Sequence, residues 1–209
     1  MTSNDKLYGE LSKAAQLVDK AERGVGIAAI IAEALRSIGQ DPVLVGGAAV
    51  EYYTEGGYST TDIDMLAEGG PDLVRVMESL GFTKLGKDFV QDELRIYVEF
   101  PGRCLQANEH ANKIKVGSRT LKIISMEDLV VDRLCSFKFW QSAIDGLNAI
   151  KLLELGVDDE ARLNRRAGEQ EVQDALSRVR EVREEVIRKK LNPEQANALL
   201  IKKMRSLKA

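Results

Sequence analysis

The sequence has few of the residues that mark disulfide-rich, zinc-binding or membrane-embedded proteins. Its 209 residues include two cysteines and one histidine. Cys104 and Cys135 lack the paired spacing of a zinc site, and His110 has no neighbouring histidine or cysteine with which to share a metal ion. No apolar run approaches the roughly 20 residues that span a bilayer, and the first residues lack the basic start and apolar stretch of a secretory signal. We therefore expect reduced cysteines, no membrane partner and a cytoplasmic protein.

The chain also lacks a strong excess of positive charge. Its formal net charge is −3, and 44% of its residues are hydrophobic. This balance excludes a generally basic protein that coats nucleic acid, and it supports a packed core. Residues 157–209 carry a net charge of +3, against −6 for residues 1–156. The mildly basic tail is compatible with an anionic partner, although a solvated helical surface has the same composition.

Hydrophobic periodicity predicts helices and strands in alternation. Apolar residues recur at helical spacing on both sides of Gly24 and Gly26, and these glycines are expected to separate two helices. Short apolar or alternating runs bounded by glycine or proline predict strands. The expected strands are 43–45, 62–66, 94–100, 113–116 and 120–124, and helices are expected near 7–18, 27–38, 48–54, 73–80, after 125, and over 142–155, 170–190 and 192–209.

This order of elements predicts an α/β fold. A small mixed β-sheet would be flanked by helices and followed by a helical C-terminal region. We expect three parts: N-terminal helices packing on the core (1–40), a core that carries the chemistry (41–156) and a helical C-terminal extension (157–209).

Two aspartates mark the candidate site. Asp62 and Asp64 alternate along one strand, so both carboxylates are expected on one face, about 6–7 Å apart along the backbone. They would repel each other unless a cation neutralised them, and Mg²⁺ or Mn²⁺ binds carboxylate and phosphate oxygens together. If the strand of Glu99 is a neighbour, Glu99 completes a cup of three carboxylates that can hold two metal ions. Arg95 shares the Glu99 face by alternation, where it could pair with that carboxylate or with a phosphate.

Gly46 and Gly47 lie upstream, at an expected turn from strand to helix. Glycines there let the backbone approach a phosphate closely, and the N–H groups of the next helix point at it. A tight turn by itself would also require glycine. The more specific signal is the whole order: strand, Gly-Gly, helix, a Thr-x-Asp-Ile-Asp strand, and a later strand that carries a glutamate.

That order resembles the nucleotidyltransferase superfamily with the polymerase-β-like fold, and in particular its minimal bacterial and archaeal members, which include the toxin-type enzymes of toxin–antitoxin systems. The resemblance covers about the middle half of the chain, in LVGGAAVEYYTEGGYSTTDIDML (44–66), YVEF (97–100) and, more loosely, SMEDLVVDRLCSFKFW (125–140). It implies nucleotide contacts for Gly46, Gly47 and Thr60, and catalytic and metal-binding roles for Asp62, Asp64 and Glu99. It further implies that Glu99 orients or deprotonates the acceptor hydroxyl.

Three positions differ from the common pattern of the family. Gly47 stands where serine is frequent, Tyr58 stands where toxin-like relatives carry a basic residue, and Glu99 stands where aspartate is more usual. The serine hydroxyl and the basic side chain would each contact phosphate in those relatives. This chain therefore lacks two of the family's phosphate contacts.

The resemblance predicts a magnesium-dependent enzyme that binds a nucleoside triphosphate such as ATP. It would move a nucleoside monophosphate to an unidentified hydroxyl on an RNA end, a protein or a small molecule, and the toxin-type resemblance implies an antitoxin partner. The alternative is a non-catalytic interaction or scaffold protein that retains the fold and binds a partner through residues 157–209. Nucleotide preference, acceptor and oligomeric state stay open from the sequence.

Overall fold

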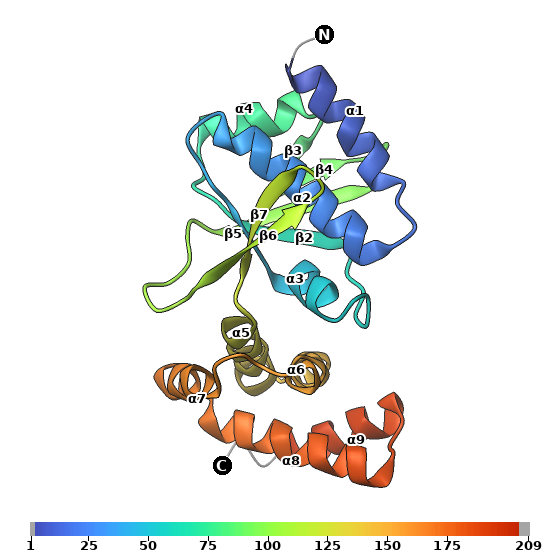
Figure 1. The fold of residues 1–209 in the computed structure, drawn as a ribbon, viewed down its shortest axis with the longest axis vertical. Helices are drawn as coiled ribbons and strands as arrows, with labels where there is room; N and C mark the ends of the chain where they lie inside the picture. Colours follow the sequence, from blue (N-terminus) through green and yellow to red (C-terminus); the bar gives the residue numbers. More distant parts are fainter. Residues whose placement is uncertain (1–2, 205–209) are drawn as a thin grey trace. The chain divides into compact units, whose positions relative to one another are not determined.

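The computed structural model describes residues 3–204 and divides into two compact units, 1–125 and 126–209, with the boundary in the chain between Ser125 and Met126. The first unit contains a mixed sheet of seven strands in the order β3-β4-β5-β2-β1-β7-β6 (Figure 1). β1 pairs in parallel with β7, and β2 with β5, whereas the other neighbours are antiparallel. The strands are β1 (Val43–Val45), β2 (Asp62–Leu66), β3 (Thr83–Leu85), β4 (Asp88–Gln91), β5 (Ile96–Gly102), β6 (Ala111–Val116) and β7 (Arg119–Ile124). The expected α/β fold with a mixed sheet is confirmed.

Four helices belong to this unit: α1 (Ser3–Ala15), α2 (Lys20–Arg36), α3 (Gly46–Tyr53) and α4 (Pro71–Ser79). The central one is α2, which contacts α1, α3 and α4 as well as strands β2, β6 and β7. Because α2 has neighbours on several sides, it is apolar around most of its circumference, and side chains such as Ile31 and Leu35 are fully buried. On the strand side, Ile63 and Met65 of β2 enter the same core.

The expected break at Gly24 and Gly26 was wrong, because both glycines lie inside α2. The helix begins at Lys20. The side chain of Asp19 caps this end by accepting a hydrogen bond from the Glu22 amide at 2.9 Å. A Cβ atom at Gly26 would lie 3.6 Å from the Cβ of Ala14 in α1. That is an ordinary van der Waals distance, so the packing of α1 on α2 does not require glycine there. The buried apolar side chains along α2 outweigh the low helix propensity of the two glycines.

Two strands were not expected from the sequence. β3 and β4 form a hairpin that extends the sheet beyond β5. β3 is exposed along its length, so it lacks the alternation of buried and exposed residues that a half-buried strand shows. β5 itself begins at Ile96 and continues through Pro101 to Gly102, past the expected end.

The second unit is helical: α5 (Met126–Phe139), α6 (Ala143–Leu155), α7 (Glu160–Glu169), α8 (Gln173–Lys189) and α9 (Pro193–Met204). α5 packs on α6, α7 and α8, and α6 packs on α8 and α9. The expected part 157–209 therefore shares its core with α5 and α6, and the contact boundary lies about 30 residues earlier in the chain than the expected one. The reason is that the apolar faces of α5 and α6 are covered by α7, α8 and α9.

A buried ion cluster joins α5 to α7. The side chain of Asp128 is fully buried and accepts hydrogen bonds from Arg162 and from Nε of Arg166, the latter at 2.9 Å. Glu127 lies 3.7 Å from Arg162 and accepts from the backbone amide of Asp159 at 3.1 Å. Because each of these buried charges has a partner of opposite sign, the cluster fixes how α7 lies on α5.

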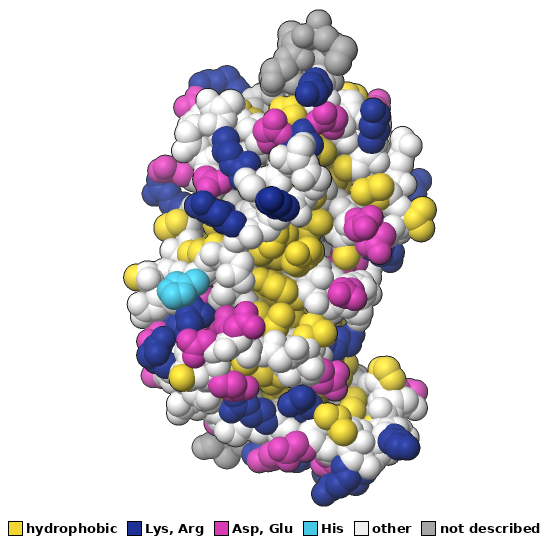
Figure 2. All heavy atoms as spheres, viewed as in Figure 1, with side chains coloured by type: hydrophobic (Ala, Val, Ile, Leu, Met, Phe, Trp, Pro, Cys, Tyr) yellow, Lys and Arg dark blue, Asp and Glu magenta, His cyan; other side chains and the backbone are white. Residues whose placement is uncertain are grey.

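Within residues 3–204, no helix combines the length and the apolar character that crossing a membrane requires. On the face shown in Figure 2, basic and acidic side chains are interspersed, and they do not gather into one extended basic patch. His110 is exposed there. This surface agrees with the near-balanced charge of the sequence.

Candidate active site

The turn from β1 to α3 brings Gly46 against Asp64. Val45 pairs with Asp64 in the antiparallel register of β1 and β2, and Gly46 follows with a φ of +63°. A Cβ atom at Gly46 would lie 2.1 Å from Oδ2 of Asp64 and 2.8 Å from its Cγ. A left-handed backbone and such a close approach both require glycine. The structure therefore places the first glycine of the pair directly beside the second aspartate.

Gly47 is packed in the same way against Thr60. A Cβ atom at Gly47 would lie 2.9 Å from Oγ1 of Thr60 and 3.0 Å from its Cβ. Oγ1 of Thr60 in turn accepts from the backbone amide of Asp62 at 3.4 Å. A serine at position 47, which is frequent in the family that the sequence resembles, would crowd Thr60. The contact gives a physical reason for glycine at this position.

The three carboxylates lie on neighbouring strands. β2 and β5 pair in parallel, with Asp64 opposite Glu99 and Asp62 opposite Tyr97. Directly paired residues project from the same face of a sheet, and so do residues two apart on one strand. Asp62, Asp64 and Glu99 therefore share one face. The strand of Glu99 is a neighbour of the strand of Asp62 and Asp64, as a cup of three carboxylates requires.

A lysine that the sequence did not single out also reaches this face. Nζ of Lys87, in the turn between β3 and β4, donates to Oε1 of Glu99 at 2.6 Å. The Glu99 carboxylate raises the pKa of Lys87, with further contributions from Asp88 and Asp64. No signal in the sequence could have found Lys87, because its place depends on the unexpected β3–β4 hairpin.

The suggested pairing of Arg95 with Glu99 was wrong. Arg95 precedes β5 and has a φ of +53°, so the strand alternation does not extend to it. Its side chain lines a different hollow, together with Arg23 and Glu51. Lys87 takes the place at Glu99 that the alternation suggested for Arg95.

The fit of the carboxylates to a divalent cation rests on their chemistry and placement. Oxygen donors from two neighbouring strands on one face suit Mg²⁺ or Mn²⁺, and Asp62 and Glu99 line a common hollow with Lys87 and Tyr97. Within the described part of the chain, no three carboxylate, histidine or cysteine groups already stand close enough to hold an ion. The ammonium of Lys87 is the cation that Glu99 contacts in this arrangement. Metal binding stays a prediction, with Asp62, Asp64 and Glu99 as its ligands.

Comparison with known proteins supports the fold. No protein-family model matches the sequence, and no curated protein does. The structure is similar to the crystal structure of an antigenic nucleotidyltransferase-like protein from Paracoccidioides brasiliensis, with a TM-score of 0.61 and 16% sequence identity. The match covers 81% of this chain and 91% of that chain. The chain thus has a nucleotidyltransferase-like fold.

Proposed function

We propose that the protein is a metal-dependent nucleotidyltransferase that moves a nucleoside monophosphate from a nucleoside triphosphate to a hydroxyl acceptor. The observation that carries the proposal is the contact of Gly46 with Asp64, in a strand register that sets Asp64 opposite Glu99. A glycine turn that leads into a helix suits a phosphate chain, and the adjacent carboxylates suit the cation that accompanies it. The nucleotidyltransferase-like fold neighbour supports the same reading.

The proposed reaction assigns a task to each group. Backbone amides at Gly46 and Gly47 bind the triphosphate, and Asp62, Asp64 and Glu99 hold Mg²⁺. When bound, the metal supplies positive charge to the phosphates and to the attacking oxygen. The acceptor oxygen forms a bond to the α-phosphorus, the bond from that phosphorus to the bridging oxygen breaks, and pyrophosphate leaves with the electron pair. Glu99 accepts the hydroxyl proton, and Lys87 lies beside Glu99, where it can contact phosphate oxygens.

The finer attributes of this function stay predictions. They are the use of ATP, an acceptor hydroxyl on RNA, a protein or a small molecule, the toxin-type resemblance with its antitoxin partner, and a cytoplasmic location. The alternative is a non-catalytic scaffold that works through the C-terminal helices. Truncating the chain at Val157 would not test it cleanly. A cut there would remove α7–α9 from the core that they share with α5 and α6.

Asp64→Asn should abolish label transfer. The substitution keeps the shape of the side chain and removes the charge that holds the metal, so we expect a loss on the order of 10²-fold or more. The measurement uses each of four α-³²P-labelled triphosphates with Mg²⁺ and separate RNA, protein and small-molecule fractions of a cell extract. Asp72→Asn, on the exposed surface of α4, is the matched control and should transfer label like the wild type.

The same assay separates the two functional hypotheses. A wild type that labels no fraction, or an Asp64→Asn variant that labels as well as the wild type, would contradict the enzyme. The scaffold alternative predicts that partner binding survives Asp64→Asn unchanged.

A further inference from the structure

Lys87 reaches the carboxylate face from the tip of a tight hairpin. Leu85 of β3 pairs with Asp88 of β4, so the loop between the two strands contains two residues, Gly86 and Lys87. Gly86 has a φ of +62°, which suits the first position of the II′ turns that join antiparallel strands. Nζ of Lys87 donates to Oε1 of Glu99 at 2.6 Å. The turn thus fixes the backbone of the lysine, and its flexible side chain spans the distance to Glu99 on β5.

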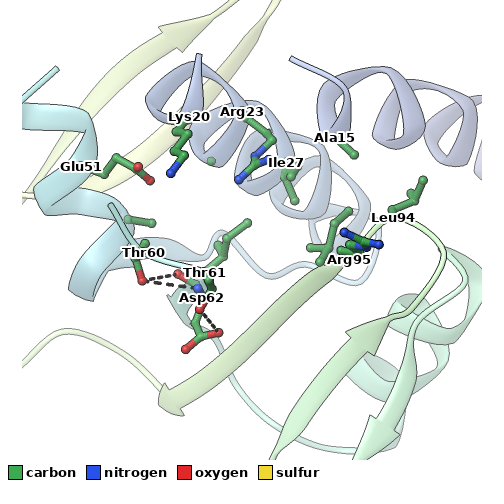
Figure 3. Close-up of a pocket in the computed structure, with 14 residues that line it drawn as sticks. Ala15, Lys20, Arg23, Ile27, Glu51, Thr60, Thr61, Asp62, Leu94 and Arg95 are labelled. Atoms are coloured by element: carbon green, nitrogen blue, oxygen red, sulfur yellow. Dashed lines mark hydrogen bonds between the residues drawn. The ribbon is translucent and has the colours of Figure 1, made fainter. Parts of the chain in front are cut away.

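A fourth carboxylate stands in the same row of the sheet. Asp88 lies directly opposite Glu99 in the pairing of β4 with β5, and Glu99 lies directly opposite Asp64 in the pairing of β5 with β2. Directly paired residues project from the same face. Figure 3 shows the Asp62 carboxylate directed away from α2, as expected for the face that carries the others. Because like charges directly opposite each other destabilise a sheet, a cation stabilises this face.

The ammonium of Lys87 is a cation that this face holds weakly. The side chain of Lys87 is 74% exposed, and that of Glu99 is 27% exposed. Exposed ion pairs contribute little to stability, so the ammonium can leave Glu99 at small cost. A divalent cation carries twice the charge and binds oxygens of several carboxylates at once. Such an ion would compete with Lys87 for the same carboxylate, and its attraction to that carboxylate is the stronger of the two.

We propose that Lys87 is a positioning residue that takes the place of the metal at Glu99 before the metal binds. The metal displaces the ammonium from Oε1 of Glu99, and Lys87 then turns from the carboxylates to the phosphates of the nucleoside triphosphate. This inference rests on the proposed function, because it requires the metal and the triphosphate at this face. Lys87 stays protonated throughout, so the exchange moves no proton and changes only which oxygen the ammonium contacts.

The exchange gives Lys87 opposite effects on two ligands. Without triphosphate, the ammonium competes with the metal at Glu99, so removal of its charge should tighten metal binding. With triphosphate, the ammonium donates a charge-assisted hydrogen bond to a phosphate oxygen, so its removal should weaken nucleotide binding. A lysine that only stabilised the hairpin would affect both ligands in the same direction.

The test is calorimetric titration of the full chain, first with Mn²⁺ alone and then, in excess Mn²⁺, with non-hydrolysable analogues of the four nucleoside triphosphates. We expect Lys87→Gln to bind Mn²⁺ alone roughly twofold to fivefold more tightly than the wild type. The same variant should bind the preferred analogue roughly fivefold to tenfold more weakly. Lys87→Arg keeps the charge and the reach of the side chain, so it should bind Mn²⁺ like the wild type.

Lys115→Gln is the matched control, because Lys115 is exposed on the edge strand β6 and its replacement changes the net charge equally. It should bind both ligands like the wild type. A Lys87→Gln variant that binds Mn²⁺ no more tightly than the wild type, including the case in which neither binds it, would overturn the inference. An equal gain for Lys115→Gln would do the same, because net charge alone would then account for the effect.

Failure of the proposed function gives a different result. If Lys87→Gln gains affinity for Mn²⁺ but the wild type binds no analogue, the place of Lys87 at Glu99 is supported and the triphosphate site is contradicted. If the wild type binds an analogue only with Mn²⁺ but Lys87→Gln gains no affinity for Mn²⁺, the triphosphate site is supported and the role of Lys87 is overturned.

Discussion

Gly46→Ala should lower the free energy of unfolding by roughly 2–5 kcal/mol and remove metal-dependent binding of nucleotide. The first contribution is the left-handed backbone, which costs an L-residue about 1–2 kcal/mol, since φ is +63° at this position. The second is the new methyl group, which would lie 2.1 Å from Oδ2 of Asp64. Forcing a close-packed site apart costs about 1–3 kcal/mol, and the displaced carboxylate would be one of the proposed metal ligands.

Two control glycines separate these contributions. Gly39 has a φ of +78° with no atom near its Cβ position, so Gly39→Ala carries the backbone cost alone, about 1–2 kcal/mol. Gly9 lies in α1 with open space around it, so Gly9→Ala should stabilise by roughly 0.5–1 kcal/mol. Urea unfolding followed by circular dichroism measures all three. If Gly46→Ala and Gly39→Ala lose the same amount of unfolding free energy relative to the wild type, the close contact of Gly46 with Asp64 is contradicted.

Asp128→Ala should destabilise the helical unit by about 3–5 kcal/mol, because it leaves buried arginines without their shared carboxylate. The side chain of Asp128 is fully buried between Arg162 and Arg166, whose side chains are 7% and 4% exposed. The urea midpoint, followed by fluorescence of Trp140, measures the loss. Trp140 is the only tryptophan of the chain and lies in this unit.

Glu160→Ala provides the comparison in the same unit. Glu160 pairs with Arg180 between α7 and α8, but its side chain is 59% exposed, so its removal should cost less than about 1 kcal/mol. Equal losses for the two variants would mean that burial of Asp128 does not set its contribution.

The strands that position the site could be predicted because each carries its own local signal. Val43–Val45 is a short apolar run closed by glycine, and Asp62–Leu66 alternates strictly. The predicted bounds of both strands therefore agree with those in the structure. The hairpin of β6 and β7 was recognisable from the glycine in its loop. Pairing between distant strands leaves no such local signal, and the position of Glu99 opposite Asp64 emerged only with the sheet order.

The remaining features depend on contacts that a single sequence does not display. Gly24 and Gly26 lower helix propensity, yet they lie in a helix because the apolar side chains around them are buried against neighbouring elements. Lys87 reaches Glu99 through a hairpin whose exposed strand has no apolar alternation. Glu51 reads as an ordinary polar helix residue, and its burial beside Arg23 follows from how α2 lies against α3. Each of these is a tertiary effect that overrides a local preference.

The central claim is that Asp62 and Asp64 form a metal-dependent triphosphate site, and calorimetry tests it most directly. A non-hydrolysable ATP analogue would be titrated with Mg²⁺ into the wild type and into an Asp62→Asn/Asp64→Asn double variant, followed by analogues of the other three nucleotides. We predict binding by the wild type that requires Mg²⁺ and is lost in the double variant. A wild type that binds none of the four nucleotides, or a double variant that binds as tightly as the wild type, would contradict the account.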